Sequence, residues 1–317
     1  MKQFFKNFWL LLKKAYVGFI DDNGMKLSAS LSYYTIFSLS PMLVIIISLA
    51  SLFFGREAVQ GQVYGQIKDL IGSSAALEVQ DMIKNAQLSN HTIKATVIGL
   101  VTLLLGATGV FSEIQDSINF IWSLRAKPKR GWLKIIINRL LSFSMIVTIG
   151  FLLLVALVIN TVLDVFSEHV QHLFPHMAIY IFYIINLLLL LIIITFMFSV
   201  IFKVLPDGYL AWKDALIGAT FTSFFFMIGK FIIGLYLGQT KAGFAYGAAG
   251  SLIVILLWVY YSSIILYFGA EFTKAYSYTF GKGIIPKKEA VMIETKEVVS
   301  DATKILKIEK DIIEKLS

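Results

Sequence analysis

Hydrophobic residues along the chain gather into six long runs, which charged or turn-forming residues separate. The runs are centred on residues 30–54, 93–121, 140–163, 179–204, 215–237 and 250–272. A helix needs about 20 mostly apolar residues to cross a bilayer, and each run reaches that length. Because a helix satisfies its own backbone hydrogen bonds in lipid, the pattern predicts an all-α polytopic membrane protein with six transmembrane helices.

Composition and charge agree with this class and add an orientation. The chain is 57% hydrophobic and 15% charged, whereas soluble domains average about 45–50% apolar and about 25% charged residues. Most of the 28 Lys and Arg residues lie before the first run, between the second and third, between the fourth and fifth, or after the sixth. The positive-inside rule therefore predicts that both termini are cytoplasmic, and it explains the net charge of +8 without nucleic acid.

Amphipathic segments flank the predicted bundle at both ends. Apolar residues recur at helical spacing over residues 4–19, with lysines elsewhere, which predicts a cationic helix in the inner membrane interface. Partner docking or regulation is the alternative role. The pattern from Val298 to Leu316 predicts a cytoplasmic helix for oligomer contact or membrane docking. We divide the chain into an interfacial helix (1–26), a transmembrane domain (27–280) and a charged, helical cytoplasmic tail (281–317).

Three local features of the bundle carry further expectations. Residues 55–92 form the longest extracytoplasmic loop, and two short amphipathic helices are expected there as a cap. Pro41 lies inside the first run and removes a backbone donor, which predicts a kink. The fifth and sixth runs are rich in glycine, which allows helices to approach closely. Gly247 marks either a movable, broken helix or plain packing.

Ionisable side chains at membrane depth are costly and are candidates for function. Glu113, Asp116 and Asn119 lie late in the second run, and Ser112, Asp116 and Asn119 share one helix face. Glu271 is expected at a similar inner depth in the sixth run. Lys230 falls in the outer half of the fifth run, and Asp164 at the outer end of the third run is a candidate partner by position. The alternatives are that the carboxylates are interfacial and hydrated, and that the lysine reaches the interface along its stem.

The histidines suggest a weak metal candidate in one extracytoplasmic loop. Glu168, His169 and His172 have helical spacings that a zinc ion could use. A polar loop is the better interpretation, because Pro175 disrupts the pattern and no H-E-x-x-H motif is present. The chain has no cysteine, and we expect no cofactor.

Enzyme motifs are missing from the sequence. There is no P-loop, no dinucleotide-binding glycine fingerprint, no G-x-S-x-G elbow and no kinase motif set. A nuclease needs clustered metal-binding carboxylates or a catalytic histidine pair, and the carboxylates here are dispersed. We therefore expect neither an enzyme nor a nucleic-acid partner.

Several short blocks follow one another along the chain: Ala29–Pro41, Gly109–Phe111 with Ile114–Gln115 and Asn119–Trp122, Phe202–Pro206, Trp212–Ala215 with Gly218–Ala219, Tyr246–Ser251 with Leu257–Tyr260, and Gly269–Glu271. Together and in this order, they resemble the YihY/BrkB family of bacterial inner-membrane proteins. The resemblance covers roughly residues 10–280. It implies a six-span protein of the bacterial cytoplasmic membrane, associated with serum resistance and envelope lipid handling. Members have also carried a ribonuclease BN label, which the residues of this chain do not support.

Together these observations favour transport or flipping of an amphiphile or envelope lipid through a polar path in the bundle. Residues expected to line or gate that path are Pro41, Glu113, Asp116, Asn119, Lys230, Gly247, Tyr260 and Glu271. A channel or proton-coupled carrier for a small solute or ion is one alternative, and a non-transporting envelope scaffold is another. Expected partners are membrane lipids and a second copy of the chain, which would bind through spans five and six or the C-terminal helix.

Overall fold

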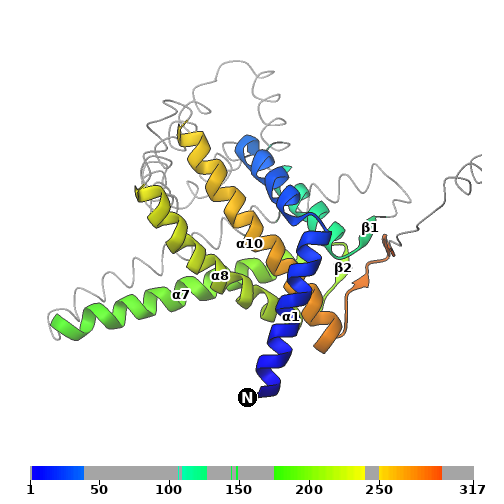
Figure 1. The fold of residues 1–317 in the computed structure, drawn as a ribbon, viewed down its shortest axis with the longest axis horizontal. Coiled ribbons are helices and arrows are strands. Elements are labelled where there is room, and N and C mark those ends of the chain that lie inside the picture. The colour runs from blue at the N-terminus through cyan, green and yellow to red at the C-terminus, as the bar shows by residue number, and fades with distance from the viewer. Residues whose placement is uncertain are drawn as a thin grey trace, which may run out of the picture.

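The structure, a computed structural model, describes residues 2–38, 109–126, 175–239 and 250–294, together with positions 106, 144 and 148. The described part is mainly helical, with four short strands (Figure 1). Several expectations lie outside the described residues: those for Pro41, Gly247, the loop at 55–92, the loop with Glu168, His169 and His172, and the helix from Val298.

Three described helices are long and apolar enough to cross a bilayer. They are α7 (Pro175–Val204), α8 (Trp212–Gln239) and α10 (Gly250–Phe280). Their candidate spans are 18, 22 and 26 residues long, close to the roughly 20 residues that a bilayer needs. The helices predicted for the fourth, fifth and sixth runs are confirmed, and the first three runs lie wholly or partly outside the described residues.

Small residues let α8 and α10 pack closely along an antiparallel register. A Cβ at Gly218 of α8 would overlap the Thr273 hydroxyl of α10, and a Cβ at Gly269 of α10 would overlap Thr222 of α8. The Thr222 and Thr273 hydroxyls donate to the carbonyls of Gly218 and Gly269, each at 2.7 Å. Each threonine thus satisfies its hydroxyl within its own helix while its side chain fills the space over the partner's glycine.

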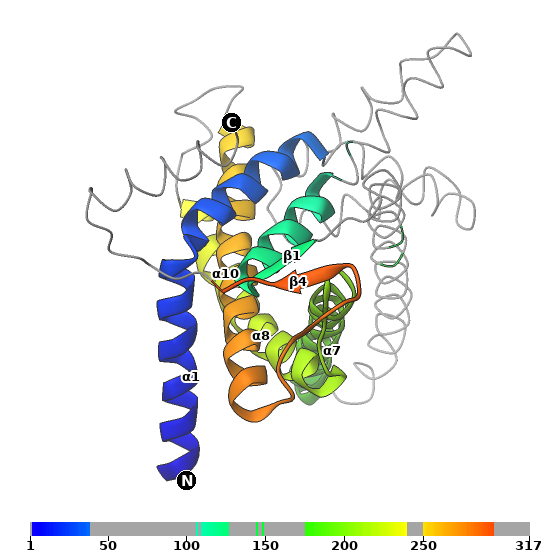
Figure 2. The same cartoon turned by 90° about the vertical axis from the view of Figure 1, so that its right-hand side faces the viewer.

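α1 (Lys2–Asp21) is the predicted N-terminal helix, and it packs along the C-terminal half of α10 (Figure 2). Leu11 and Ala15 are buried in a cluster with Phe272 and Ala275 of α10. This part of the apolar stripe that we expected to enter the membrane interface is therefore covered by α10. The opposite side of the helix exposes Trp9, among other apolar residues. The interfacial position of α1 remains a prediction.

A short helix at residues 109–121 is anchored to α10 by a tryptophan. Trp122 is fully buried, and its indole Nε1 donates a hydrogen bond of 3.1 Å to the carbonyl of Ala270. Ser123 then adopts a left-handed conformation with φ 56°, which is uncommon for a residue other than glycine. This turn directs the chain into strand β1, Leu124–Ala126.

Two antiparallel strand pairs join the ends of the helices that we predict to be cytoplasmic. β1 pairs with β4 (Ala290–Met292), and β2 (Gly208–Tyr209) pairs with β3 (Ile285–Pro286). β1 and β4 lie beside the helical bundle in Figure 2. The segment after α10 therefore returns to the α7–α8 connection and to the end of the helix at 109–121.

The structure of this returning segment differs from the helix that the sequence predicts there. The sequence predicts a helical tail over 281–317, but residues 281–294 are extended or turned. Gly283 has φ +73°, a conformation that glycine adopts readily, and Pro286 cannot donate a helical hydrogen bond. α10 continues past the centre of the sixth apolar run, so nine helical residues follow Glu271.

Candidate functional site

The Glu271 carboxylate lies buried between α10 and α1. The residue is 2% exposed, whereas the sequence left open a hydrated, interfacial position. A Cβ built on Gly18 of α1 would lie 2.5 Å from Glu271 Oε2 and 2.9 Å from its Cδ. The carboxylate therefore occupies the space that a side chain at position 18 would fill.

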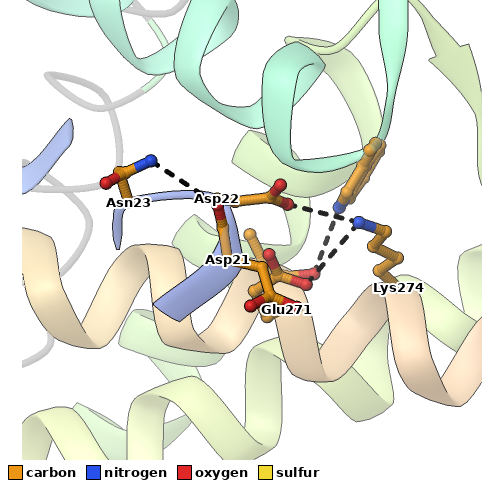
Figure 3. A network of polar contacts seen from close by, with 7 residues as sticks. Asp21, Asp22, Asn23, Glu271 and Lys274 are labelled. Carbon is orange, nitrogen blue, oxygen red and sulfur yellow. Dashed lines mark hydrogen bonds and ion pairs between the residues drawn. The ribbon is translucent and has the colours of Figure 1, made fainter. Parts of the chain in front are cut away.

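Glu271 shares one lysine with Asp22 (Figure 3). Lys274 Nζ lies 3.4 Å from Asp22 Oδ2 and 3.8 Å from Glu271 Oε2. The longer distance is an ion pair without a proper hydrogen bond. Glu271 Oε1 is buried and has no hydrogen-bond partner among the described residues. The site thus contains a carboxylate whose hydrogen-bonding capacity is not satisfied.

A tight turn at the end of α1 positions Asp22 for this contact. Asn23 adopts φ 54°, a left-handed conformation that asparagine tolerates better than most residues. The Asp22 backbone N–H donates to the Gly18 carbonyl at 2.8 Å, and the Lys26 N–H donates to the Asn23 carbonyl at 2.8 Å. The turn therefore closes α1 and begins the next helix, at residues 24–38, within two residues.

The predicted residues Glu113 and Asp116 lie near α10, on the helix at 109–121. Glu113 is half-buried and Asp116 is exposed. Both are close enough to the buried Tyr267 of α10 to act on it electrostatically. Tyr267 and Glu271 are one helical turn apart. The structure therefore brings these predicted carboxylates near the Glu271 segment of α10.

Asn119, another predicted path residue, binds the α7–α8 connection instead of facing open space. Its amide donates to Asp207 Oδ2 at 3.2 Å, and its carbonyl oxygen accepts from the Asp207 backbone N–H at 2.8 Å. Gln115 also donates to Asp207, at 3.4 Å. This cluster gives Asn119 a structural partner that the sequence pattern did not indicate.

Lys230 and Tyr260 lie at a different depth from Glu271. A Cβ at Gly229 would overlap the Tyr261 ring, so the antiparallel register places Lys230 at the level of Tyr260. Tyr260 and Glu271 are eleven positions apart on α10, which corresponds to about 16 Å along the axis. The structure does not bring Lys230 and Glu271 together. The partner that we suggested by position for Lys230, Asp164, lies outside the described residues.

Comparison with known sequences identifies the family. Residues 15–292 match the sequence family described as Virulence factor BrkB. The chain belongs to this BrkB family. The matched region includes Gly18, Asp22, Glu271 and Lys274, so the whole Glu271 site lies inside it. The resemblance inferred from the sequence blocks is thereby confirmed.

Curated relatives are bacterial membrane proteins. A UPF0761 membrane protein of Haemophilus influenzae (strain 86-028NP) is 25% identical over 272 residues, which cover 84% of this chain and 93% of the relative. One of Pseudomonas aeruginosa (strain LESB58) is 27% identical over 262 residues, covering 80% of this chain and 59% of the relative. One of Tolumonas auensis is 26% identical over 255 residues, covering 78% of each. No solved structure matches the chain.

The BrkB-family chain is therefore a membrane protein in which a carboxylate is buried between helices. Among the described residues, no group of three or more His, Cys, Asp or Glu side chains is arranged to hold a metal ion. What the arrangement offers is an ion pair and a carboxylate that can accept or release a proton. Sequence reasoning identified Glu271 but missed Gly18, Asp22 and Lys274. The spacing of Glu271 and Lys274 by three residues was the available local signal.

Proposed function

We propose that this BrkB-family protein moves an amphiphile, such as an envelope lipid, along polar groups in its helix bundle. The buried Glu271, with Lys274 and Asp22, is the observation that carries the proposal. Ionisable groups among membrane helices are expensive to bury and usually mark a route for polar cargo. A bundle that served only as a scaffold would be more stable with apolar residues at these positions.

The surroundings of Lys230 favour an amphiphile over a fully polar solute as the transported molecule. It is half-buried on α8, and its neighbours Ile228 and Phe231 are 41% and 70% exposed. A cation beside an exposed apolar surface suits a molecule with an anionic headgroup and hydrocarbon tails. Lys230 and the Glu271 cluster lie about 16 Å apart along α10, so polar groups are available at two depths along the bundle.

A lipid-scrambling assay tests the proposal. The purified protein is reconstituted into liposomes that contain a headgroup-labelled fluorescent phosphatidylglycerol, and an impermeant reductant then bleaches the outer leaflet. We expect the wild-type protein to expose label from the inner leaflet, and Glu271→Gln and Lys230→Met to slow this exposure severalfold. Glu289→Gln is the matched control, because Glu289 is exposed in the turn between β3 and β4.

The same preparation separates the alternatives. A second set of liposomes carries an entrapped pH dye and a fluorescent solute. Solute or proton flux without lipid movement would favour a channel or a proton-coupled carrier. If the wild-type protein moves neither lipid nor solute, or if both variants move lipid at the wild-type rate, the proposed route through Glu271 and Lys230 is wrong.

A further inference from the structure

The Glu271 site holds more negative charge than the groups around it can neutralise. The charged groups that face Glu271 among the described residues are Lys274 from α10 and Asp21 and Asp22 from the end of α1. The Lys274 ammonium thus forms ion pairs with two carboxylates, those of Asp22 and Glu271. The carboxylate of Asp21 lies close by. A buried charge without a full partner costs several kcal/mol, on the order of the penalty for breaking a buried ion pair. The site therefore favours a neutralising ligand.

The arrangement of the groups around Glu271 favours a proton as the neutralising ligand. Among the described residues, Glu271 Oε1 is buried and has no hydrogen-bond partner, and no group of three or more His, Cys, Asp or Glu side chains is placed to hold a metal ion. The Asp22 and Glu271 carboxylates approach the same ammonium, since Lys274 Nζ lies 3.4 Å from Asp22 Oδ2 and 3.8 Å from Glu271 Oε2. Two ionised carboxylates can only accept hydrogen bonds, so a hydrogen bond between them requires a proton on one of them. A proton on Glu271 lets its O–H donate to Asp22, which still pairs with Lys274.

We propose that Glu271 and Asp22 form a shared proton-binding site whose occupancy sets how α1 is seated on α10. The inference goes beyond transport and holds whatever substrate the protein moves. When the proton leaves, the Glu271 carboxylate needs water or a donor, but the Gly18 backbone occupies its surroundings. Hydration of the carboxylate therefore requires α1 to move away from α10.

The connection beyond α1 extends this movement to the rest of the bundle. The turn at Asp22 and Asn23 joins α1 directly to the helix at 24–38, which contains the start of the first predicted span. A change in the seating of α1 is thus transmitted to that helix through two residues. Proton binding at one end of α10 is linked in this way to the position of the first span.

Infrared difference spectroscopy tests whether Glu271 holds the proton. The full chain in liposomes is compared at acidic and alkaline pH. We expect the carbonyl-stretch band of a protonated carboxylic acid to disappear on alkalinisation, to be missing in Glu271→Gln and to remain in the control Glu289→Gln. A band that persists unchanged in Glu271→Gln overturns the assignment.

Two further variants test sharing with Asp22. In Asp22→Asn the amide can donate to an ionised Glu271, so we expect the band to disappear at lower pH than in the wild type. In Lys274→Met the ionised carboxylate loses its cation, so the band should persist to higher pH. Midpoints that do not move, or that move in the reverse directions, overturn the shared site. These variants also keep the test valid if Glu271→Gln does not fold.

Spin-label distances test the seating of α1. The chain has no cysteine, so labels can be placed at Lys13→Cys on α1 and Lys282→Cys after α10, both at exposed positions. We expect one short distance at acidic pH and a longer or broader distribution at alkaline pH. Glu271→Gln should keep the short distance at both pH values. If the distance distribution of the wild type does not change with pH, or if it changes equally in Glu271→Gln, proton binding at Glu271 does not control the seating of α1.

Discussion

Asn119 and Asp207 bind each other in both directions across the predicted cytoplasmic end of the bundle. The Asn119 amide donates to the Asp207 carboxylate, and the Asp207 backbone N–H donates to the Asn119 carbonyl. Asn119 is 7% exposed, so water offers little compensation if either bond is lost. The amide side chain supplies both the donor and the acceptor that this arrangement uses. The pair fixes the α7–α8 connection to the helix at 109–121.

Replacing Asn119 therefore tests this junction. Asn119→Asp removes the donor and places a second carboxylate beside Asp207, so we expect a loss of about 3–5 kcal/mol of stability, as for an uncompensated buried charge. Asn119→Ala should lose about 1–3 kcal/mol, because it leaves polar groups unpaired. Chemical denaturation in detergent micelles measures both variants. Gln115→Ala is the control for a longer, weaker bond to the same carboxylate, and an Asn119→Asp variant as stable as Gln115→Ala would contradict the assignment.

A double-mutant cycle tests the contact between Gly18 and Glu271. Gly18→Ala adds a Cβ at 2.5 Å from Oε2, and overpacking of this kind costs about 1–3 kcal/mol. Alanine also stabilises a helix interior by about 1 kcal/mol relative to glycine, which offsets part of the loss. In a Glu271→Ala background the collision is absent, so Gly18→Ala should become stabilising. Equal effects of Gly18→Ala in both backgrounds, measured by thermal unfolding, would show that the two residues do not interact.

The sequence predicted those parts of the fold that local patterns encode. Apolar run length predicted α7, α8 and α10, and helical periodicity predicted α1. Hydropathy alone does not define the end of α10 at Phe280, because its last turns carry polar residues. The structure satisfies these residues within the bundle. Ser277, for example, donates to Asp214 of α8 at 2.8 Å. The strands were missed because two or three residues are too short to show a period.

Of the candidate site, the sequence predicted Glu271 but none of its partners. Glu271 stands out as an ionisable side chain in an apolar run. Its partners Gly18 and Asp22 lie some 250 positions earlier in the chain, and a single sequence contains no signal that joins such distant residues. Likewise, the tie between Asn119 and Asp207 depends on a tertiary contact. Non-local packing, not local propensity, decides which polar residues are buried here.

The reciprocal glycine–threonine contact predicts a second specific coupling. Gly218→Ala would place a Cβ on the Thr273 hydroxyl, so we expect a loss of about 1–3 kcal/mol. Thr273→Ala in the same chain removes the colliding hydroxyl and should restore part of that stability. Thr220→Ala, at an exposed position on α8, is the control for the loss of a threonine side chain. Thermal unfolding of Gly218→Ala, Thr273→Ala, the double variant and Thr220→Ala checks this. Additive effects of Gly218→Ala and Thr273→Ala would contradict the direct contact.

In the returning segment after α10, truncating two neighbouring isoleucines should have very different effects on stability. Ile284 is 3% exposed and belongs to the main hydrophobic cluster, whereas Ile285 is 59% exposed. Ile284→Ala should therefore destabilise the protein by about 2–5 kcal/mol, the range for truncating a buried isoleucine. Ile285→Ala deletes the same atoms from an exposed site, so its effect should stay within about 0.5 kcal/mol. Denaturant unfolding measures the difference. If both substitutions have the same effect, the segment at 281–294 does not pack on the bundle in solution.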